Sequence, residues 1–309
     1  MLLKDIITKG IETVSQTYPE REAREMVFML LEHMLGTRRH THIVEPEYRV
    51  DELKVGEVDA AFLRLAAGEP LQYVCRQASF YGRDFHVSPA VLIPRPETEL
   101  VCRTALESVS RGQRLETSTS APKILDLCTG SGCIAWTMAL ECPGSEVTAV
   151  DISEDALAIA STQNFSEEIQ RTGAKTPIFL RADVLGKTDV LVDILSGQDG
   201  LAVAERRTYD LILSNPPYVM DKEKSLMRGN VLDHEPHLAL FVSDDDPLIF
   251  YDALARLSAE LLAPSGTGIV EINEALGQET AEVFIKAGFP HAEVLKDLSE
   301  RDRFVLFRW

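Results

Sequence analysis

The chain has 309 residues, of which 45% are hydrophobic and 26% are charged, and its formal net charge at pH 7 is −18. The length is sufficient for two domains, and the proportions are typical of a soluble globular protein. The acidic excess argues against a protein that binds long stretches of nucleic acid, because phosphates repel carboxylates.

The sequence also predicts a reducing, cytoplasmic location without a membrane span or a metal site. No apolar run reaches 18 residues, and the first residues do not resemble a signal peptide. The five cysteines are odd in number and scattered, with no Cys-x-x-Cys pair. His234 and His237 have a metal-like spacing, but Pro236 between them prevents two ligands from sharing one helical face.

The first 70 residues predict a small helical bundle. Apolar residues recur at helical spacing over residues 6–14 and again over residues 23–35. Pro19 separates these two patterns, and Asp51 can cap a third helix that ends before residue 70. We therefore assign residues 1–70 to a helical domain.

Residues 71–95 predict a β-hairpin that links this domain to a second one. Two runs with alternating aromatics, residues 71–74 and 78–87, are expected to pair as strands. The Pro-x-Pro stretch that follows contains Arg95 and Glu97 and precedes a helix start. These two residues either cap that helix or lie at the mouth of the next domain's crevice, and the second option makes them candidate substrate-binding residues.

A cofactor site is predicted where the sheet of the second domain begins. A strand over residues 123–127 runs directly into a Gly-containing turn, and a helix follows at once. Glycines let a ligand approach the backbone closely, and a helix N-terminus presents free N–H groups. A second strand, residues 146–150, ends at Asp151, 19 residues after Gly132, where an acid is expected to bind two ribose hydroxyls. The resulting cofactor-binding candidates are Cys128, Thr129, Gly130, Ser131, Gly132 and Asp151.

The next strand, residues 178–180, is followed by Asp183 and Val184, which join the cofactor-binding candidates. Asp183 can accept a hydrogen bond from an adenine amino group, or it is an ordinary acid of a loop. Residues 185–207 form a polar, Gly-containing insertion in which the sequence predicts no further element.

The stretch Asn215-Pro216-Pro217-Tyr218 follows an apolar run, residues 209–213, that is typical of a buried strand. Two consecutive prolines have no N–H to donate, so the strand must stop and the backbone must turn. The carbonyls of Asn215 and Pro216, the amide of Asn215 and the ring of Tyr218 would form a socket for a planar NH₂ group. The alternative is a Pro-Pro turn that merely ends a strand.

Residues 219–247 form a long segment without a predicted element, and a loop of this length inside a domain is usually a functional lid. The remaining pattern completes an α/β domain over residues 96–309. It comprises helix 248–262, strand 268–272, helix 279–287, strand 292–295 and strand 304–307. From spacing alone, the sequence thus predicts an α/β cofactor domain with an NH₂-binding socket.

These motifs resemble the protein-(glutamine-N5) methyltransferases along essentially the whole chain and in order. The matching stretches are 93–99 (IPRPETE), 126–132 (DLCTGSG), 150–153 (VDIS), 215–218 (NPPY), 235–240 (EPHLAL) and 296–303 (KDLSERDR). The resemblance implies a Rossmann-like class I methyltransferase sheet and the cofactor S-adenosyl-L-methionine. It is closest to the branch that methylates the side-chain amide of the Gln in the Gly-Gly-Gln loop of peptide chain release factors (HemK/PrmC). The helical domain would then bind the partner protein.

One residue departs from the family pattern. The family's turn usually begins with Gly where this chain has Cys128, and the Cys form resembles the sister branch that methylates a ribosomal-protein glutamine. Residues 296–303 favour the release-factor branch, so methylation of a ribosomal-protein glutamine is the alternative. Gly130 and Gly132 are retained, and cofactor binding is expected in either case.

The resemblance gives the socket a catalytic role. An amide nitrogen is a poor nucleophile, because its lone pair is delocalised into the carbonyl. Acceptors at Asn215 and Pro216 would hold both N–H bonds and direct the nitrogen at the sulfonium methyl, through contacts that strengthen as positive charge develops. The expected catalytic residues are Asn215, Pro216 and Tyr218; the expected substrate-binding residues are Asn215, Pro216, Pro217, Tyr218, Arg95 and Glu97. Asn215 would also contact the cofactor, and no metal is expected.

Two other function classes share part of this pattern. An adenine amino-methyltransferase of DNA or RNA uses a similar socket, but the net charge of −18 and the lack of a basic target-reading region argue against it. A non-enzymatic adaptor could keep the fold, but intact Gly130, Gly132, Asp151 and Asn215 argue against that. We therefore expect a cytoplasmic enzyme whose partner is a release factor, with no membrane and no direct nucleic-acid contact.

Overall fold

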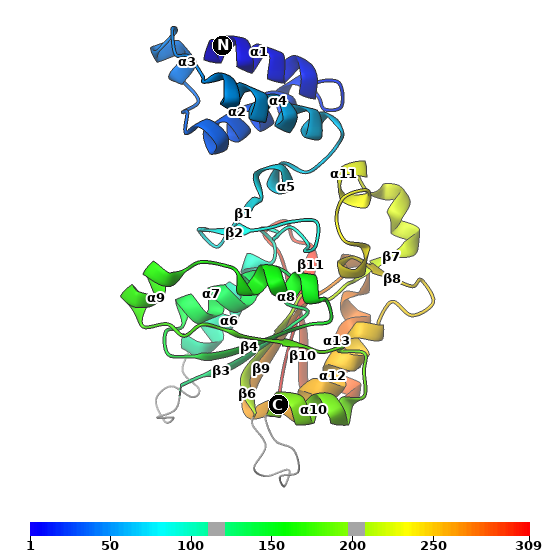
Figure 1. Ribbon diagram of the computed structural model, residues 1–309. Helices are drawn as coiled ribbons and strands as arrows, with labels where there is room; N and C mark the ends of the chain where they lie inside the picture. The colour runs from blue at the N-terminus through cyan, green and yellow to red at the C-terminus, as the bar shows by residue number, and fades with distance from the viewer. Residues whose placement is uncertain (111–120, 197–207) are drawn as a thin grey trace. The chain divides into compact units, whose positions relative to one another are not determined.

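The first helices follow the apolar spacing of the sequence (Figure 1). The computed structural model describes residues 1–110, 121–196 and 208–309, and in it α1 spans Leu3–Val14, α2 spans Glu20–Leu35 and α4 spans Glu52–Ala66. Pro19 immediately precedes α2, and Gly36 ends it in the left-handed region at φ 66°. The Asp51 side chain accepts a hydrogen bond from Leu53 N at the start of α4. The three predicted helices are therefore confirmed.

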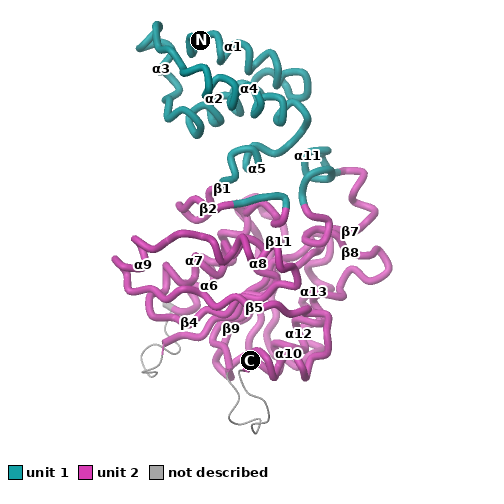
Figure 2. Tube along the Cα trace, in the orientation of Figure 1, with its two compact units in different colours: residues 1–77, 87–89, 227–235 teal, residues 78–86, 90–226, 236–309 magenta. Residues whose placement is uncertain are grey.

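The described chain divides into two units (Figure 2). One contains residues 1–77, 87–89 and 227–235, and the other contains residues 78–86, 90–226 and 236–309. The first unit is helical and adds α3 (Thr41–Val44), α5 (Leu71–Cys75) and α11 (Gly229–Leu232), none of which the sequence predicted. Its helices pack so closely that a Cβ added at Gly10 would lie only 2.4 Å from Phe62 Cζ. The domain limits 1–70, 71–95 and 96–309 stay a prediction.

The linker hairpin forms, but the prediction of its first strand was wrong. Residues 71–74 lie in α5, which Pro70 initiates through its fixed φ, and the side chain of Tyr73 is buried. The two strands are β1 (Gln77–Phe80) and β2 (Arg83–His86). Tyr81 and Gly82 join them with φ values of 51° and 72°, as a two-residue hairpin turn requires.

The second unit is built on a seven-stranded sheet with strand order β10-β11-β9-β6-β3-β4-β5. Strands β3 (Lys123–Leu127), β4 (Glu146–Asp151), β5 (Ile178–Arg181), β6 (Tyr209–Ser214) and β9 (Leu262–Glu271) pair in parallel. Strand β11 (Asp302–Arg308) pairs antiparallel with both β9 and β10 (His291–Lys296). The chain moves from β3 outward to β4 and β5 and then returns to β6, which makes the β3–β6 boundary the switch point where such sheets place ligands. The predicted α/β class is confirmed.

Helices cover both faces of this sheet (Figure 1). Helices α6 (Glu99–Ser110), α7 (Cys133–Glu141), α8 (Glu154–Ser161) and α9 (Ser166–Thr172) lie on one side, and α10 (Thr188–Ser196), α12 (Ile249–Leu261) and α13 (Gly277–Lys286) lie on the other. Two separate apolar cores result, one containing Trp136 and Met138 of α7, the other containing Leu254 of α12 and Phe284 of α13. The central strands β3, β4 and β6 are buried on both faces, which is why they read as nearly continuous apolar runs, whereas the edge strands β5 and β10 are partly exposed.

Two stretches that looked irregular in the sequence contain regular structure. Within residues 185–207, where the sequence carried little information, α10 buries Leu191, Val192 and Leu195 in the apolar core; residues 197–207 lie outside the described residues. Residues 219–247 hold β7 (Val219–Met220), a 3₁₀ turn (Asp221–Leu226), α11, a second 3₁₀ turn (His237–Ala239) and β8 (Phe241–Val242). Strands β7 and β8 pair in parallel, which closes this segment on itself. A lid function for it stays a prediction.

Candidate active site

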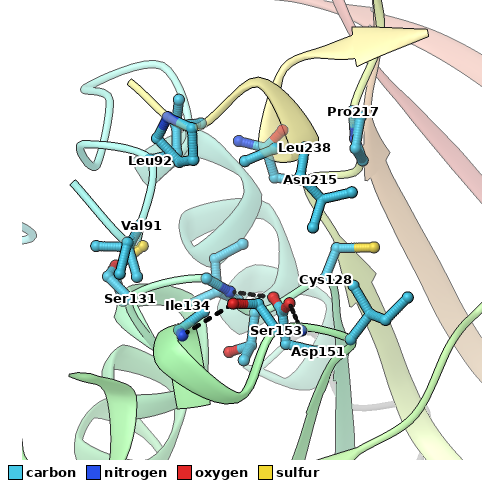
Figure 3. A pocket seen from close by; sticks show the side chains of 18 of the residues that line it. Val91, Leu92, Cys128, Ser131, Ile134, Asp151, Ser153, Asn215, Pro217 and Leu238 are labelled. Carbon is cyan, nitrogen blue, oxygen red and sulfur yellow. Dashed lines mark hydrogen bonds between the residues drawn. The ribbon is translucent and has the colours of Figure 1, made fainter. Parts of the chain in front are cut away.

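A cavity of the second unit opens at the carboxyl ends of its parallel strands (Figure 3). The space that it bounds is about 1180 Å³, including the part that is open to solvent. Its walls come from stretches far apart in the chain: 90–95, 128–131, 133–134, 151–153, 182–185 and 238–239, with Thr98, Ala156, Asn215, Pro217, Pro236 and Phe250. Gly132 is not among the lining residues. The sheet therefore brings the predicted cofactor loop and the predicted socket to one place.

The cofactor loop is a turn with three left-handed residues. Cys128, Gly130 and Gly132 have φ values of 61°, 54° and 79°. A glycine adopts this region without strain, and at position 132 packing also favours it, because a Cβ there would make a tight 3.0 Å contact with Ala160 Cβ. The added Cβ at Gly130 would meet nothing within 4 Å, so that residue leaves its side open to a ligand. Three N–H groups of the loop are engaged within the protein: Thr129 N donates to Val150 O, Gly130 N to Asp151 Oδ2 and Gly132 N to Thr129 O.

Cys128 takes a backbone conformation that favours glycine. A side chain at φ 61° costs on the order of 1–3 kcal/mol, so the fold must hold Cys128 there against strain. Its thiol lines the cavity, and Figure 3 shows it between Asp151 and Asn215. Burial raises the pKa of this thiol far above its ordinary value, so the group is a neutral thiol at physiological pH.

Asp151 ends β4 at the opposite end of the cavity from Asn215 (Figure 3). Its Oδ2 accepts a hydrogen bond from Gly130 N at 2.9 Å, and its Oδ1 accepts one from Ser153 N at 2.9 Å. Burial raises the pKa of Asp151, and these two N–H donors hold part of that rise back. Each carboxylate oxygen keeps a further lone pair, which is what a pair of ribose hydroxyls would need.

The other residues of the loop support it from within. Thr129 Oγ1 donates a 2.6 Å hydrogen bond to Asp126 Oδ2, so the Thr129 side chain is engaged with the protein although the residue lines the cavity. Asp126 also accepts from Ala135 N at 3.2 Å, and its Oδ1 is buried without a partner among the described residues. Burial raises the pKa of Asp126 to about 7. Ser131 is buried, lines the cavity, and accepts a hydrogen bond at its backbone carbonyl from Gln163 Nε2.

The third predicted cofactor contact lies after β5. Asp183 lines the cavity with an exposed side chain, and its Oδ1 accepts a hydrogen bond from Leu185 N at 2.9 Å. Val184 also lines the cavity and is buried. The geometry leaves the second carboxylate oxygen of Asp183 for a donor in the cavity, so the adenine contact stays a prediction compatible with this position.

The socket stretch ends β6 as predicted. Ser214 is the last residue of the strand, and its Oγ donates to Leu127 O at 2.7 Å, which ties the end of β6 to the end of β3. Asn215 is half-buried and lines the cavity, as does the buried Pro217. Pro216 is buried and Tyr218 half-buried, and neither is among the residues that line the cavity. The side chain that reaches the cavity with a polar group is therefore Asn215.

Two polar residues at the socket were missed in the sequence, Thr98 and Glu271. Asn215 Nδ2 donates to Thr98 Oγ1 at 3.2 Å, and Thr98 Oγ1 donates to Glu271 Oε2 at 2.7 Å. Tyr218 donates its hydroxyl to the other oxygen, Glu271 Oε1, at 2.9 Å. Glu271 is the last residue of β9, so an acid at the end of a buried strand was the signal that could have identified it.

Opposing influences act on the pKa of Glu271 inside the protein. Burial raises its pKa, whereas the hydroxyl donors Thr98 and Tyr218 and the charge of Arg303 lower it. Burial likewise raises the pKa of Tyr218 well above its usual value, so that phenol stays a donor. The Tyr218 hydroxyl is thus engaged with Glu271, and the packing of its ring against a substrate amide stays a prediction.

The residues just before α6 differ in whether they line the cavity. Arg95 is half-buried and lines the cavity, and Thr98 is buried at its wall. Glu97 is exposed and is not among the lining residues. The role of Arg95 and Glu97 in substrate binding stays a prediction.

Among the described residues, no group of three or more His, Cys, Asp or Glu side chains is arranged to hold a metal ion. No helix in the described ranges combines the length and apolar character needed to cross a membrane.

Comparisons of this sequence with known proteins give consistent matches along most of the chain. Residues 5–75 match the model of the PrmC N-terminal domain, and residues 112–232 match that of the methyltransferase small domain. A "Release factor glutamine methyltransferase" of Bacteroides thetaiotaomicron is 38% identical over 95% of this chain and 95% of its own length. One of Flavobacterium psychrophilum is 32% identical over 99% of this chain and 98% of its own.

Among solved structures, a release-factor-specific protein-(glutamine-N5) methyltransferase from Alicyclobacillus acidocaldarius is 26% identical and covers 72% of this chain and 98% of its own, with a TM-score of 0.41.

Proposed function

The chain belongs to the release factor glutamine methyltransferases, and from this premise we propose that it methylates the side-chain amide of the Gln in the Gly-Gly-Gln loop of peptide chain release factors. The family assignment makes it an S-adenosyl-L-methionine-dependent methyltransferase. When bound, the cofactor supplies an electrophilic methyl group on a sulfonium. The residues of this chain would bind and orient the groups around that methyl.

The cavity fits such a cofactor in its donor and acceptor groups. At one end, Asp151 is fixed by Gly130 N and Ser153 N and has lone pairs for the two hydroxyls of a ribose. The loop of residues 128–132 exposes backbone that a ligand can approach closely, and Asp183 and Val184 line the part of the cavity after β5. We propose Cys128, Thr129, Gly130, Ser131, Gly132, Asp151, Asp183 and Val184 as the cofactor-binding residues.

The observation that carries the proposed reaction is the orientation of Asn215. Its Nδ2 donates to Thr98, whereas its Oδ1 accepts no hydrogen bond from any described residue. Oδ1 is therefore left as an acceptor at the end of the cavity opposite Asp151 (Figure 3). A glutamine amide carries two N–H donors and needs such acceptors.

We propose that Asn215 Oδ1 and the Pro216 carbonyl accept the two N–H bonds of the substrate glutamine. Holding both bonds fixes the plane of the amide and aims its nitrogen, which supplies the orientation part of the rate enhancement. As the nitrogen gains positive character, both hydrogen bonds become charge-assisted and stronger, which stabilises the transition state more than the ground state. The proton is then released readily from an alkylated amide nitrogen, so no strong base is needed beside it.

Mass spectrometry of a release factor tests this function. The full chain is incubated with S-adenosyl-L-methionine carrying an isotopically labelled methyl group and with a purified, unmethylated release factor. We expect one labelled methyl group on the Gln of the Gly-Gly-Gln loop and none in a release factor whose Gln is replaced by Asn.

Parallel incubations with ribosomal proteins and with double-stranded DNA separate this function from its alternatives. Methyl transfer to a ribosomal-protein glutamine, or to DNA, but not to the release factor would contradict the proposal. We propose a cytoplasmic location, because the substrate acts in translation, and protein rather than nucleic acid as the partner.

A further inference from the structure

Four side chains from three separate stretches of the sequence form one hydrogen-bonded chain behind the socket. It runs from Asn215 through Thr98 to Glu271 and ends at Tyr218. The joined residues are 117, 173 and 53 positions apart, and they come from the ends of β6 and β9 and from the stretch before α6. Thr98 is 2% exposed and Glu271 is 1% exposed, so water does not compete for these bonds.

The direction of each bond follows from the chemistry of Glu271. An ionised carboxylate has only acceptors, so both hydroxyls that reach it must donate. Tyr218 donates to Oε1 and Thr98 donates to Oε2. The single hydroxyl proton of Thr98 is thereby used, and Thr98 Oγ1 can only accept from its third neighbour.

That third neighbour is Asn215, whose side-chain amide has a donor group, NH₂, and an acceptor, the carbonyl oxygen Oδ1. With Thr98 restricted to accepting, the NH₂ group must face Thr98, and the carbonyl oxygen Oδ1 must face the other way. The reverse orientation would place two acceptors, Asn215 Oδ1 and Thr98 Oγ1, against each other in a buried place. Such an arrangement leaves both oxygens unsatisfied and is strongly disfavoured.

We propose that Thr98 and Glu271 are positioning residues that set which end of the Asn215 amide faces the substrate. Glu271 fixes the proton of Thr98, and Thr98 fixes the amide of Asn215. Without them the amide turns freely about its last bond and presents NH₂ to the NH₂ of the substrate glutamine for part of the time. The inference deepens the proposed function and rests on it.

Neighbouring contacts hold these four hydrogen-bonded side chains in place. Tyr251 donates its hydroxyl to the backbone carbonyl of Glu271 at 3.1 Å, and Asn273 Nδ2 donates to the backbone carbonyl of Tyr218 at 3.1 Å. Burial raises the pKa of Glu271, and the Thr98 and Tyr218 hydroxyls and the charge of Arg303 offset part of that rise. The acceptor Asn215 Oδ1 is therefore held in place by the folded sheet and does not depend on a bound ligand.

Kinetics of Thr98 variants test the positioning role. Val has nearly the shape of Thr but no hydroxyl, so Thr98→Val should lower kcat on the release factor roughly 10- to 100-fold, with KM and cofactor Kd changed only a few-fold. Thr98→Ser keeps the hydroxyl and should restore most of the turnover. A Thr98→Val enzyme with wild-type kcat would overturn the inference.

A double-mutant cycle separates positioning from a general structural effect. If Thr98 acts only through the Asn215 amide, Thr98→Val should have less than about a twofold effect in an Asn215→Ala background. A loss of the same size in both backgrounds would mean that Thr98 supports the fold and does not orient Asn215. Glu271→Gln should behave like Thr98→Val, because its amide can donate to Thr98 and release the hydroxyl proton toward Asn215.

An NMR measurement keeps the inference testable even if the release factor is not the substrate. In the ¹⁵N-labelled full chain, the side-chain amide signal of Asn215 is assigned by its loss in Asn215→Ala. We expect slow exchange with water for this NH₂ group, loss of that protection in Thr98→Val, and its return in Thr98→Ser. Unchanged protection in Thr98→Val would overturn the inference, whereas failure of methyl transfer by the wild-type enzyme would overturn only the proposed function.

Discussion

The two ends of the cavity are held in different ways. At the cofactor end, hydrogen bonds join residues 2, 3, 9, 21 and 32 positions apart, all between β3 and the residues that follow α8. At the socket end, they join residues 53, 117 and 173 positions apart. The first end is therefore a local motif that two neighbouring strands can build, whereas the second exists only when the whole sheet has formed. We expect changes at the two ends to separate cofactor binding from turnover.

The largest expected effect is at the socket. Asn215→Ala should lower turnover on a release factor by roughly 10²–10³, which is typical for the loss of one preorganised polar contact in a transition state. Cofactor affinity should stay within a few-fold, because Asp151 and the loop of residues 128–132 are untouched. Steady-state kinetics together with calorimetry of cofactor binding measure both quantities.

The comparison of the two ends would fail if Asn215→Ala abolished cofactor binding, since the socket would then belong to the cofactor. A methylation assay with DNA beside the release factor is the control, because an adenine methyltransferase would lose activity on DNA in the same variant.

The matching change at the other end is Asp151→Ala. It should weaken cofactor binding by on the order of 2–4 kcal/mol, because it removes a charged acceptor of two hydroxyls and also frees Gly130 N and Ser153 N. Asp151→Asn is the matched control and should lose less, since one carboxamide oxygen can still accept. Turnover at saturating cofactor should change little in either variant.

Calorimetry on these two variants gives the test. An unchanged cofactor Kd in Asp151→Ala would remove this residue from the cofactor site and leave the Gly-containing turn without its acidic partner.

The pH dependence of stability should report the buried acid of the cofactor end. Asp126 has an ordinary pKa of 3.8, and burial raises it to about 7 in the folded chain. Between these values the folded state binds a proton that the unfolded state has released, so stability is present at low pH and is lost as pH rises. The contribution is at most about 1.4 kcal/mol per pH unit, and it levels off above the folded pKa.

Asp126→Asn should flatten this slope, because the amide does not titrate. Urea unfolding of both proteins at about pH 5 and about pH 6 measures the difference in slope. Equal slopes in the two proteins would mean that the buried carboxyl of Asp126 keeps its ordinary pKa.

The smallest expected effect concerns Cys128. Cys128→Gly should keep near-normal activity and should change the free energy of unfolding by about 1 kcal/mol or less, because relief of strain at φ 61° is partly offset by the larger backbone entropy of glycine in the unfolded chain. Cys128→Ala is the matched control, since it removes the thiol but keeps the Cβ. Loss of activity in both variants would reveal a role of the thiol in the cavity.

The sequence alone determined the cofactor end. A strand, a turn with glycines at positions 130 and 132, a helix and an acid at the end of the next strand are features of neighbouring residues, and the apolar runs fixed the strands that carry them. The stop of β6 at Ser214 was equally local, because two prolines cannot donate to a ladder. The sequence was wrong where local pattern was weak, as in residues 71–74, and it did not identify α10.

Only the tertiary structure decided how the socket is held. Thr98 and Glu271 lie in stretches whose local patterns indicate a helix start and a buried strand, and nothing in either stretch points to Asn215. Their contact depends on β9 lying next to β6 and on the chain before α6 reaching the ends of both strands. Hydrogen bonds act over about 3 Å in space and are blind to separation along the chain, so the orientation of the Asn215 amide could be read only from the folded molecule.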